Sequence, residues 1–481
     1  MRLRALAVGI ILLLSGVSAL RAERVRRPRM TRAPRIGRPK PYQAPARVRF
    51  VLENGLKVVL VEDRRFPLVS LRMAVSGGTG PFARNTPGML EAMASLLTEG
   101  TTHYTARQIA EEADSFGGAV TAEATKDHVI VSAFSLSDHL DRMLALAIEV
   151  IGSPSFPEHE VVLRKKNMLE ELKLNRSQSS FLAEVAFSRR LYDPHPYGIV
   201  APTEERIRII DRISLVKLHE RLFTVNNALL VVVGDIGREE LEAKLNEAMI
   251  AWVSKPSMAL WKLPGPKAKP AKRRVVLVDR PGSAQAVLRI GNLALKEDDP
   301  DYFPLLLANQ VLGGSFAARL SADLREQKGY TYGIYSSLPA HRAAGAFVIA
   351  FQVRSEVVKP ALEAVLAHLD RMSGASVRYQ ELRQAKRMLI GGFVRELETQ
   401  EGLIDAVLHG ILLDLPEDYL DSYVEKVQAV KAGDVRRAAQ RFMRSGETLI
   451  TVVGDAKILE GELASLSEDG VLRVDHNGLI P

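Results

Sequence analysis

The sequence predicts an α+β protein built from two similar halves. Val58 lies in an aliphatic run that recurs around Val275, an offset of 217, and the Val-Val-Gly-Asp run ending at Asp235 recurs at Asp455, an offset of 220. A repeat of this length has the size of a whole domain rather than of a solenoid unit. Each half combines hairpin strands with separate groups of helices, and strict strand–helix–strand alternation is missing. We therefore expect a mainly antiparallel sheet packed with helices in each half.

The first half opens with three strands. Alternating apolar residues predict strands at 48–52 and 56–62, and Asn54-Gly55 between them is a pair that tolerates the positive φ of a tight turn. A third strand is expected at 68–76. The first sheet should therefore begin with a hairpin.

Helices follow these strands. Thr86 is expected to cap a helix with Pro87 at its first position and Gly100 as its stop, because the apolar residues between them recur at helical spacing. Thr105 and Gln108 form a capping-box pair for the next helix. The remaining elements expected in this half are strands at 119–125 and 128–134 and a helix at 137–151.

The second half repeats this order. The expected elements are strands at 274–279, 284–291, 332–338 and 346–353 and helices at 302–312, 316–326 and 358–372. The stretch 254–272 is rich in Pro and Lys and is expected to be a semi-rigid linker. The predicted lobes are therefore 48–253 and 273–470, with 471–481 as a C-terminal tail.

The N-terminus predicts export. Arg2 and Arg4 precede an apolar run at 5–20 that is shorter than a typical membrane span and is followed by small residues, the pattern of a secretory signal. We expect a signal peptide at 1–22 and a periplasmic or envelope location, with an uncleaved anchor as the alternative. The basic, Pro-rich stretch 23–47 has too few apolar residues to build a core and is expected to be a disordered leader.

The composition excludes several classes of function. The chain has no cysteine, which removes disulfides, thiolate metal sites and cysteine nucleophiles. Its formal net charge of +8 comes from the N-terminus, since residues 1–47 hold twelve of the 65 Lys and Arg and only one acid. The remainder has 53 basic and 56 acidic residues, so we expect no basic face for nucleic acid.

A series of short motifs resembles one known family. These motifs are the runs 54–63, 88–101, 195–198, 298–302, 312–316 and 324–333 and the paired Val-Val-Gly-Asp endings. Each is weak alone, but in this order they resemble the pitrilysin/insulinase family of zinc peptidases over nearly the whole chain from Val48. The resemblance implies two homologous α+β lobes that form a clam-like shell around a peptide.

The residues that bind the metal in this family are missing here. The family uses H-x-x-E-H, in which two imidazoles one helical turn apart bind zinc and the glutamate activates water, with a distant glutamate as third ligand. The matching positions are Glu91, Ala94 and Ser95, with Glu170 or Glu171 as the distant carboxylate. We expect no bound metal in this chain. Whether Glu91 and a distant carboxylate hold an ion weakly stays open, as does whether this helix face lines a former catalytic wall or is solvated.

The second half keeps a pair of residues that the family uses on its substrate. Arg325 and Tyr332 match an Arg and a Tyr that, in the family, reach toward peptide bound at the zinc of the other lobe. A guanidinium offers several donors to peptide carbonyls, and a phenol can donate to an oxyanion. The resemblance therefore implies that both residues bind substrate. His195 is expected to be a turn residue, and Gly313-Gly314 a turn between helices rather than a phosphate loop.

The expected function is that of a catalytically inactive, non-zinc subunit. In a heterodimer this chain would supply the Arg/Tyr half of the chamber to a homologous partner that bears H-x-x-E-H, and the substrate would be a peptide or an unfolded polypeptide. The chain itself would bind no cofactor, and zinc would belong to the partner. The alternative is a non-enzymatic peptide-binding or assembly protein without a catalytic partner. A metallopeptidase with a rearranged site is a third hypothesis.

Overall fold

The computed structural model describes residues 42–250, 252, 263–266 and 272–480. The chain divides into the units Met1–Tyr42 and Gln43–Pro481, and the helices and strands of the described residues belong to the second unit. The predicted signal peptide lies outside the described residues, as do most of the predicted leader and most of the predicted linker. Within the described part of the chain, no helix is long and apolar enough to cross a membrane.

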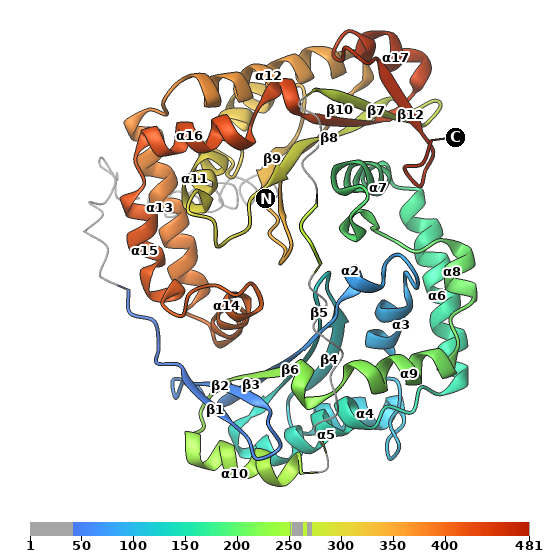
Figure 1. Cartoon of the computed structure of the whole chain (residues 1–481), viewed down its shortest axis with the longest axis vertical. Helices are drawn as coiled ribbons and strands as arrows, with labels where there is room; N and C mark the ends of the chain where they lie inside the picture. The colour runs from blue at the N-terminus through green and yellow to red at the C-terminus, as the bar shows by residue number, and fades with distance from the viewer. Residues whose placement is uncertain (1–41, 251, 253–262, 267–271, 481) are drawn as a thin grey trace, which may run out of the picture. The chain divides into compact units, whose positions relative to one another are not determined.

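The first half forms one sheet with helices packed around it (Figure 1, blue to green). Its elements in chain order are β1 (Val48–Val51), β2 (Lys57–Glu62), β3 (Leu68–Ser76), α2 (Thr79–Phe82), α3 (Met89–Leu96), α4 (Ala106–Ser115), β4 (Ala119–Ala124), β5 (His128–Leu136), α5 (Leu140–Gly152), α6 (Glu158–Arg176), α7 (Ser179–Tyr192), α8 (Glu204–Arg208), α9 (Arg212–Leu222), β6 (Ala228–Gly234) and α10 (Arg238–Ala248).

The second half forms the other sheet (Figure 1, yellow to red). Its elements are β7 (Arg274–Asp279), β8 (Gln285–Ala294), α11 (Tyr302–Leu312), the π-helix η4 (Ser321–Gln327), β9 (Ile334–Ser337), β10 (Gly345–Arg354), α12 (Val358–Gly374), α13 (Tyr379–Glu396), α14 (Gln400–Leu412), α15 (Tyr419–Ala429), α16 (Ala432–Phe442), β11 (Leu449–Gly454), α17 (Ala456–Ala464) and β12 (Val471–Val474).

The two sheets share one topology. The strand order is β1-β2-β6-β3-β5-β4 in the first sheet and β12-β7-β11-β8-β10-β9 in the second, so five strands correspond one by one. Neighbouring strands are antiparallel except for the pairs β2–β6, β7–β11 and β7–β12, which are parallel. The prediction of an α+β protein with two similar, mainly antiparallel halves is therefore confirmed.

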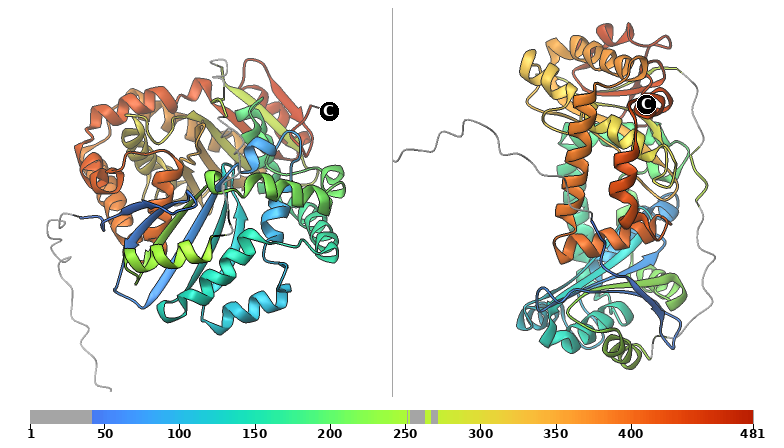
Figure 2. Two further views of the ribbon diagram at one scale, coloured as in Figure 1. Left: turned by 60° about the horizontal axis from the view of Figure 1, so that its bottom comes forward. Right: turned by 90° about the vertical axis from the view of Figure 1, so that its left-hand side faces the viewer.

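Each half lends one helix to the sheet of the other half (Figures 1 and 2). Helix α7 packs on β7, β8 and β11, and its Phe187 stands over Gly291 of β8, where an added Cβ would lie 3.1 Å from the Phe187 ring. Helix α14 packs on β3 and β6, and its Gln400 side chain donates to the Asp63 carbonyl at 3.2 Å. Because both helices bury apolar side chains in these contacts, the halves are joined by packing as well as by the chain between them.

Helix α3 begins later than expected. Gly88, not Thr86, occupies the N-cap position, and its φ of 87° lies in the left-handed region that favours glycine. A Cβ at Gly88 would also come within 2.8 Å of the Pro202 ring. The Thr86 hydroxyl instead points to the Phe82 carbonyl at 3.5 Å, so the helix starts at Met89. The Thr105–Gln108 capping box of α4 is present as expected.

The segment that carries Arg325 also differs from its prediction. The expected helix 316–326 is largely replaced by η4, in which the Lys328 N–H donates to the Asp323 carbonyl, five residues back, at 3.0 Å. Strand β9 starts at Ile334, so Tyr332 lies in the turn before it.

The predicted C-terminal tail contains a strand. Val471–Val474 form β12, which pairs in parallel with β7 and extends the second sheet at that edge. The turn before it is made by Gly470, whose φ is 74°. The second sheet therefore includes residues beyond the expected boundary at 470.

Candidate functional site

Helix α3 carries the three positions that match H-x-x-E-H, two for zinc ligands and one for the glutamate that activates water. Here Ala94 is buried, and Glu91 and Ser95 are half-buried. Ala94 is 1% exposed and belongs to the core of the first half. The Ser95 hydroxyl donates to the Ala92 carbonyl at 3.0 Å. Burial raises the pKa of Glu91, the one titratable group of the three. This face of the helix is therefore largely, but not fully, removed from solvent.

Two cations of the chain itself lie near Glu91. The Lys126 ammonium and the Arg164 guanidinium both oppose the rise in the pKa of Glu91, Lys126 more strongly. Lys126 donates to the Ile199 carbonyl at 2.8 Å, and burial lowers its pKa. Arg164 pairs at 2.8 Å with Glu171, one of the two carboxylates expected as distant ligand. Lys126 and Arg164 therefore already supply positive charge beside Glu91, as a bound zinc ion would.

This set of side chains does not fit zinc. Helix α3 offers one carboxylate and no imidazole, and both Glu170 and Glu171 on α6 are exposed. Within the described ranges, no group of three or more His, Cys, Asp or Glu side chains is placed to hold a metal ion. A lone carboxylate beside two cations is a poor ligand set for a divalent metal, because the cations compete for its charge.

Lys126 also lines a cavity of about 390 Å³ between α7 and the second sheet. Glu184 of α7 forms an ion pair with Arg289 of β8 there, and the charge of Glu184 opposes the fall in the pKa of Lys126. Tyr335 of β9 lies in the same cavity wall. Side chains of alternating charge therefore form a series from α3 to the second sheet: Glu91, Lys126, Glu184 and Arg289. No sequence pattern indicated this series, because its members lie on elements far apart along the chain.

The His-Pro-Tyr-Gly turn joins the two halves beside this cavity. His195 Nδ1 accepts the Tyr197 N–H at 3.2 Å, so His195 is a turn residue, as expected. The Tyr197 hydroxyl donates to Asp127 and accepts the Ala343 N–H at 3.2 Å. Asp127 also accepts the Arg342 N–H at 3.0 Å. The loop between β9 and β10 is therefore fixed to the first half, and Tyr197, which is 1% exposed, is the buried centre of the contact.

Arg325 lies on η4 with little of its hydrogen-bonding capacity used. The centre of its guanidinium is 4.1 Å from the centroid of the Phe316 ring, a cation–π geometry. Its Nε is 3.6 Å from a carboxylate oxygen of Glu326, which is beyond a normal hydrogen bond, and the side chain is 34% exposed. Stacking thus orients the guanidinium while leaving its donors available.

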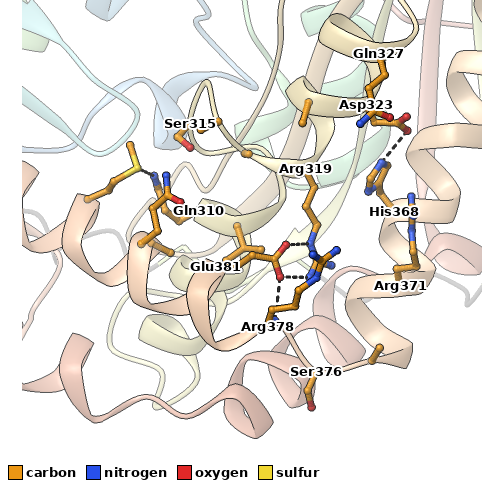
Figure 3. Close-up of a pocket in the computed structure, with 18 residues that line it drawn as sticks. Gln310, Ser315, Arg319, Asp323, Gln327, His368, Arg371, Ser376, Arg378 and Glu381 are labelled. Carbon is orange, nitrogen blue, oxygen red and sulfur yellow. Dashed lines mark hydrogen bonds and ion pairs between the residues drawn. The ribbon is translucent and has the colours of Figure 1, made fainter. Parts of the chain in front are cut away.

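Hydrogen bonds and ion pairs to neighbouring helices hold η4 in place (Figure 3). Asp323 accepts from Lys328 Nζ and from His368 Nε2, both at 2.9 Å. Arg319, just before η4, makes two hydrogen bonds to Glu381, at 2.9 and 2.8 Å. These contacts tie η4 to α12 and α13 around a cavity of about 480 Å³. The π-helix is therefore held firmly although its hydrogen-bond pattern is unusual.

Tyr332 is 96% exposed in the turn between η4 and β9. The Thr331 hydroxyl donates to the Gly333 carbonyl at 2.9 Å and accepts the Gly333 N–H at 3.2 Å, which fixes the turn. The Ser321 hydroxyl donates to the Ile334 carbonyl at 3.2 Å and ties η4 to β9. A phenol on a fixed backbone is thus presented to solvent. Arg325 and Tyr332 lie on one braced segment, and neither is part of the packed core.

These features describe a two-lobed, peptidase-like protein. Within the described part of the chain it has no cluster of side chains that could serve as a metal centre, and Arg325 and Tyr332 lie on one braced segment. The sequence matches the insulinase (peptidase family M16) model over residues 57–199 and the peptidase M16 inactive-domain model over residues 210–409. The chain belongs to this family.

Its relatives include both zinc proteases and inactive proteins by name. It is 23% identical over 408 residues to an uncharacterized zinc protease, YmxG, of Bacillus subtilis, with 84% of this chain and 97% of that protein covered. It is 22% identical over 406 residues to the non-peptidase homolog YmxG of Helicobacter pylori, with 83% and 92% covered. The crystal structure of a peptidase M16 inactive domain from Pseudomonas fluorescens has a TM-score of 0.79 and 28% identity, with 85% and 98% covered. Together with the missing imidazoles, these relationships indicate a catalytically inactive member of the family.

Proposed function

We propose that this chain is the non-catalytic subunit of an exported peptidase of the M16 family. It supplies Arg325 and Tyr332 to a peptide held at the zinc site of a homologous partner. The observation that carries the proposal is the contrast between a rigid backbone and available side chains in this segment. Among the described residues, Arg325 has a stacking contact with Phe316 and a carboxylate beyond normal hydrogen-bond distance, and Tyr332 is 96% exposed.

The chemistry of the pair suits a supporting role. The guanidinium donors of Arg325 can bind peptide carbonyls, and the hydroxyl of Tyr332 can donate to the oxyanion that forms as water attacks the peptide bond. The first half of this chain cannot activate that water, because Ala94 offers no proton acceptor and Ser95 is bonded to the backbone. Water activation therefore falls to a partner that carries H-x-x-E-H.

The test combines the purified chain with the H-x-x-E-H homologue of the same organism. Metal content, co-elution on gel filtration and cleavage of a quenched peptide are measured for each protein alone and for the mixture. We expect cleavage to rise in the mixture and to fall about 10²-fold with Tyr332→Phe, the cost typical of losing one oxyanion donor. Arg325→Lys should lower cleavage about tenfold, because lysine keeps the charge but loses the fork of guanidinium donors to peptide carbonyls. Co-elution should not change. Matched controls are Tyr379→Phe, at a tyrosine 76% exposed, and Arg354→Lys, at an exposed arginine 3.7 Å from Glu356.

Three outcomes separate the hypotheses. Robust cleavage by the pure chain would contradict the proposal, since this chain lacks the means to activate water. Variants of Arg325 or Tyr332 as active as the controls would remove the role assigned to that residue. Peptide binding by the chain, without any gain of cleavage from a zinc-bearing homologue, would support the non-enzymatic peptide-binding alternative.

A further inference from the structure

A separate cavity of about 460 Å³ lies among the helices α11, α13, α14 and α15 of the second half. Its volume is in the range of small-ligand pockets. The described residues that line it include three acids, Glu297, Glu396 and Asp405, and one histidine, His409, but no Lys or Arg. The remainder of the wall is mainly aromatic and aliphatic. Such a lining repels anions and favours a positive charge.

The cavity holds a buried, fixed carboxylate. The side chain of Glu297 is 4% exposed. One of its oxygens accepts the Tyr419 hydroxyl, and the other lies 2.8 Å from His409 Nε2. The Tyr302 side chain is a further hydrogen-bond partner of Glu297. A carboxylate has about four lone-pair sites, so these three contacts orient Glu297 and leave room for about one more donor. Positioning of this kind is typical of a carboxylate that receives a donor from a ligand.

Aromatic rings gather beside Glu297. Tyr423 stacks on Phe393 at 4.0 Å between centroids and meets Phe303 edge to face at 5.4 Å. Tyr419 lies 6.0 Å from Tyr423. The chain already places one cation against this cluster, since Lys426 Nζ is 6.0 Å from the centroid of the Tyr419 ring. The π faces of such rings attract ammonium and guanidinium groups.

The negative charge in the cavity is only partly balanced. Asp405 is offset by Arg72 of β3, whose Nε lies 3.4 Å away. Glu396 is exposed and, among the described residues, takes part in no ion pair. Burial alone would lower the pKa of His409, but its hydrogen bond to Glu297 and the charges of Glu297 and Glu396 raise it overall. The raised pKa of His409 is thus the response expected of an imidazole in a negative field.

We propose that this cavity binds an organic cation, an ammonium or guanidinium head on a short alkyl stem. The head group donates to Glu297, and the stem lies against the aromatic rings. The same chemistry is found in the basic side chain of a peptide and in a free alkylamine, and the experiment below distinguishes these sources. The site requires no catalytic partner and is independent of the role proposed for Arg325 and Tyr332.

The test is isothermal titration calorimetry on the full chain at low ionic strength. The probes are Nα-acetyl-lysine N-methylamide, its uncharged norleucine analogue, and n-butylammonium chloride. We expect the lysine compound to bind with a Kd of about 1 mM or below and the norleucine compound to bind at least about tenfold more weakly, because it lacks the charge. Tighter binding of the lysine compound than of n-butylammonium would indicate a peptide side chain as the source. The reverse order would indicate a free alkylamine.

Variants of the cavity provide the second arm. Glu297→Gln should weaken lysine binding about tenfold, the usual scale for losing a charge-assisted hydrogen bond. Because Glu297 is buried, Glu396→Gln at the exposed rim is the safer variant for folding, and we expect it to weaken binding about threefold. Glu398→Gln is the matched control, since Glu398 is exposed two residues further along and lies outside the cavity. Equal binding of the lysine and norleucine compounds would overturn the proposal. So would an absence of binding by every cation, or a Glu396→Gln variant that binds like Glu398→Gln.

Discussion

Acid should weaken the contact between the two halves, because His128 is buried there as a neutral imidazole. His128 begins β5 and is 5% exposed. It follows Asp127, the carboxylate that accepts the Tyr197 hydroxyl and the Arg342 N–H. Burial lowers the pKa of His128 from 6.5 to about 4, while the neighbouring Asp127 acts in the opposite direction and the Arg342 charge adds to the lowering. Protonation of this ring therefore costs stability.

The sign and size of the effect follow from linkage. The folded-state pKa of His128 lies below its unfolded value, so the unfolded chain takes up the proton first as the pH falls. The contribution to stability is complete above pH 6.5 and is lost between pH 6.5 and about 4. One pKa unit corresponds to 1.36 kcal/mol, so the full loss is about 3 kcal/mol.

The assay compares wild type with His128→Gln. Urea unfolding at pH 7.5 and 4.5 should show that wild type loses about 2.5 kcal/mol more than this variant, most of the full effect, because pH 4.5 is still above the folded-state pKa of about 4. His159→Gln is the control, since its side chain is 78% exposed, and it should follow wild type. Histidine NMR gives the pKa directly, through the resonance that His128→Gln removes. An imidazole that titrates near 6.5, or identical pH dependence in wild type and His128→Gln, would refute the reasoning.

Three further predictions concern packing, the Arg/Tyr segment and the metal site. Phe187→Ala should lower the free energy of unfolding by about 3–5 kcal/mol in urea titrations, because it opens a cavity between α7 and the second sheet; a loss below 1 kcal/mol would mean that the helix repacks or contributes little. Arg325→Ala should cost at most about 1 kcal/mol, since it removes one exposed cation–π contact, and a larger loss would mark the residue as structural. The double variant Glu91→His/Ser95→His should not retain stoichiometric zinc after dialysis, as measured by elemental analysis, because the Lys126 charge opposes the metal. Adding Lys126→Met should increase the zinc that is retained. Tight zinc binding by the double variant would show that Lys126 does not oppose the metal.

Much of the fold could be predicted because its signals are local. Periodicity and turn residues placed β3 and α11 at their observed bounds, and the Thr105–Gln108 capping box marked the start of α4. The repeat at offsets 217 and 220 predicted two lobes of one topology, since duplicated sequences reach the same strand order. Each of these inferences depends on residues that act within a few positions of one another.

The misplaced elements depend on more distant neighbours. Gly88 is the N-cap of α3, and the nearby Pro202 ring, which leaves no room for a Cβ, makes glycine necessary there. The π-helix η4 is stabilised by contacts such as Asp323 with His368 on α12. Strand β12 exists because β7 offers an edge for pairing. Sequence patterns describe the segment itself but not the surface on which it packs, so these features could not be predicted.

The sequence by itself determined that α3 has no imidazoles and that Arg325 and Tyr332 are present, because these are facts of covalent structure. Only the tertiary structure decided that cations lie beside Glu91 and that Glu297 meets an aromatic cluster in a cavity. Electrostatic and cation–π interactions depend on separation in space and on the exclusion of water, and packing of helices and strands far apart in the chain sets both.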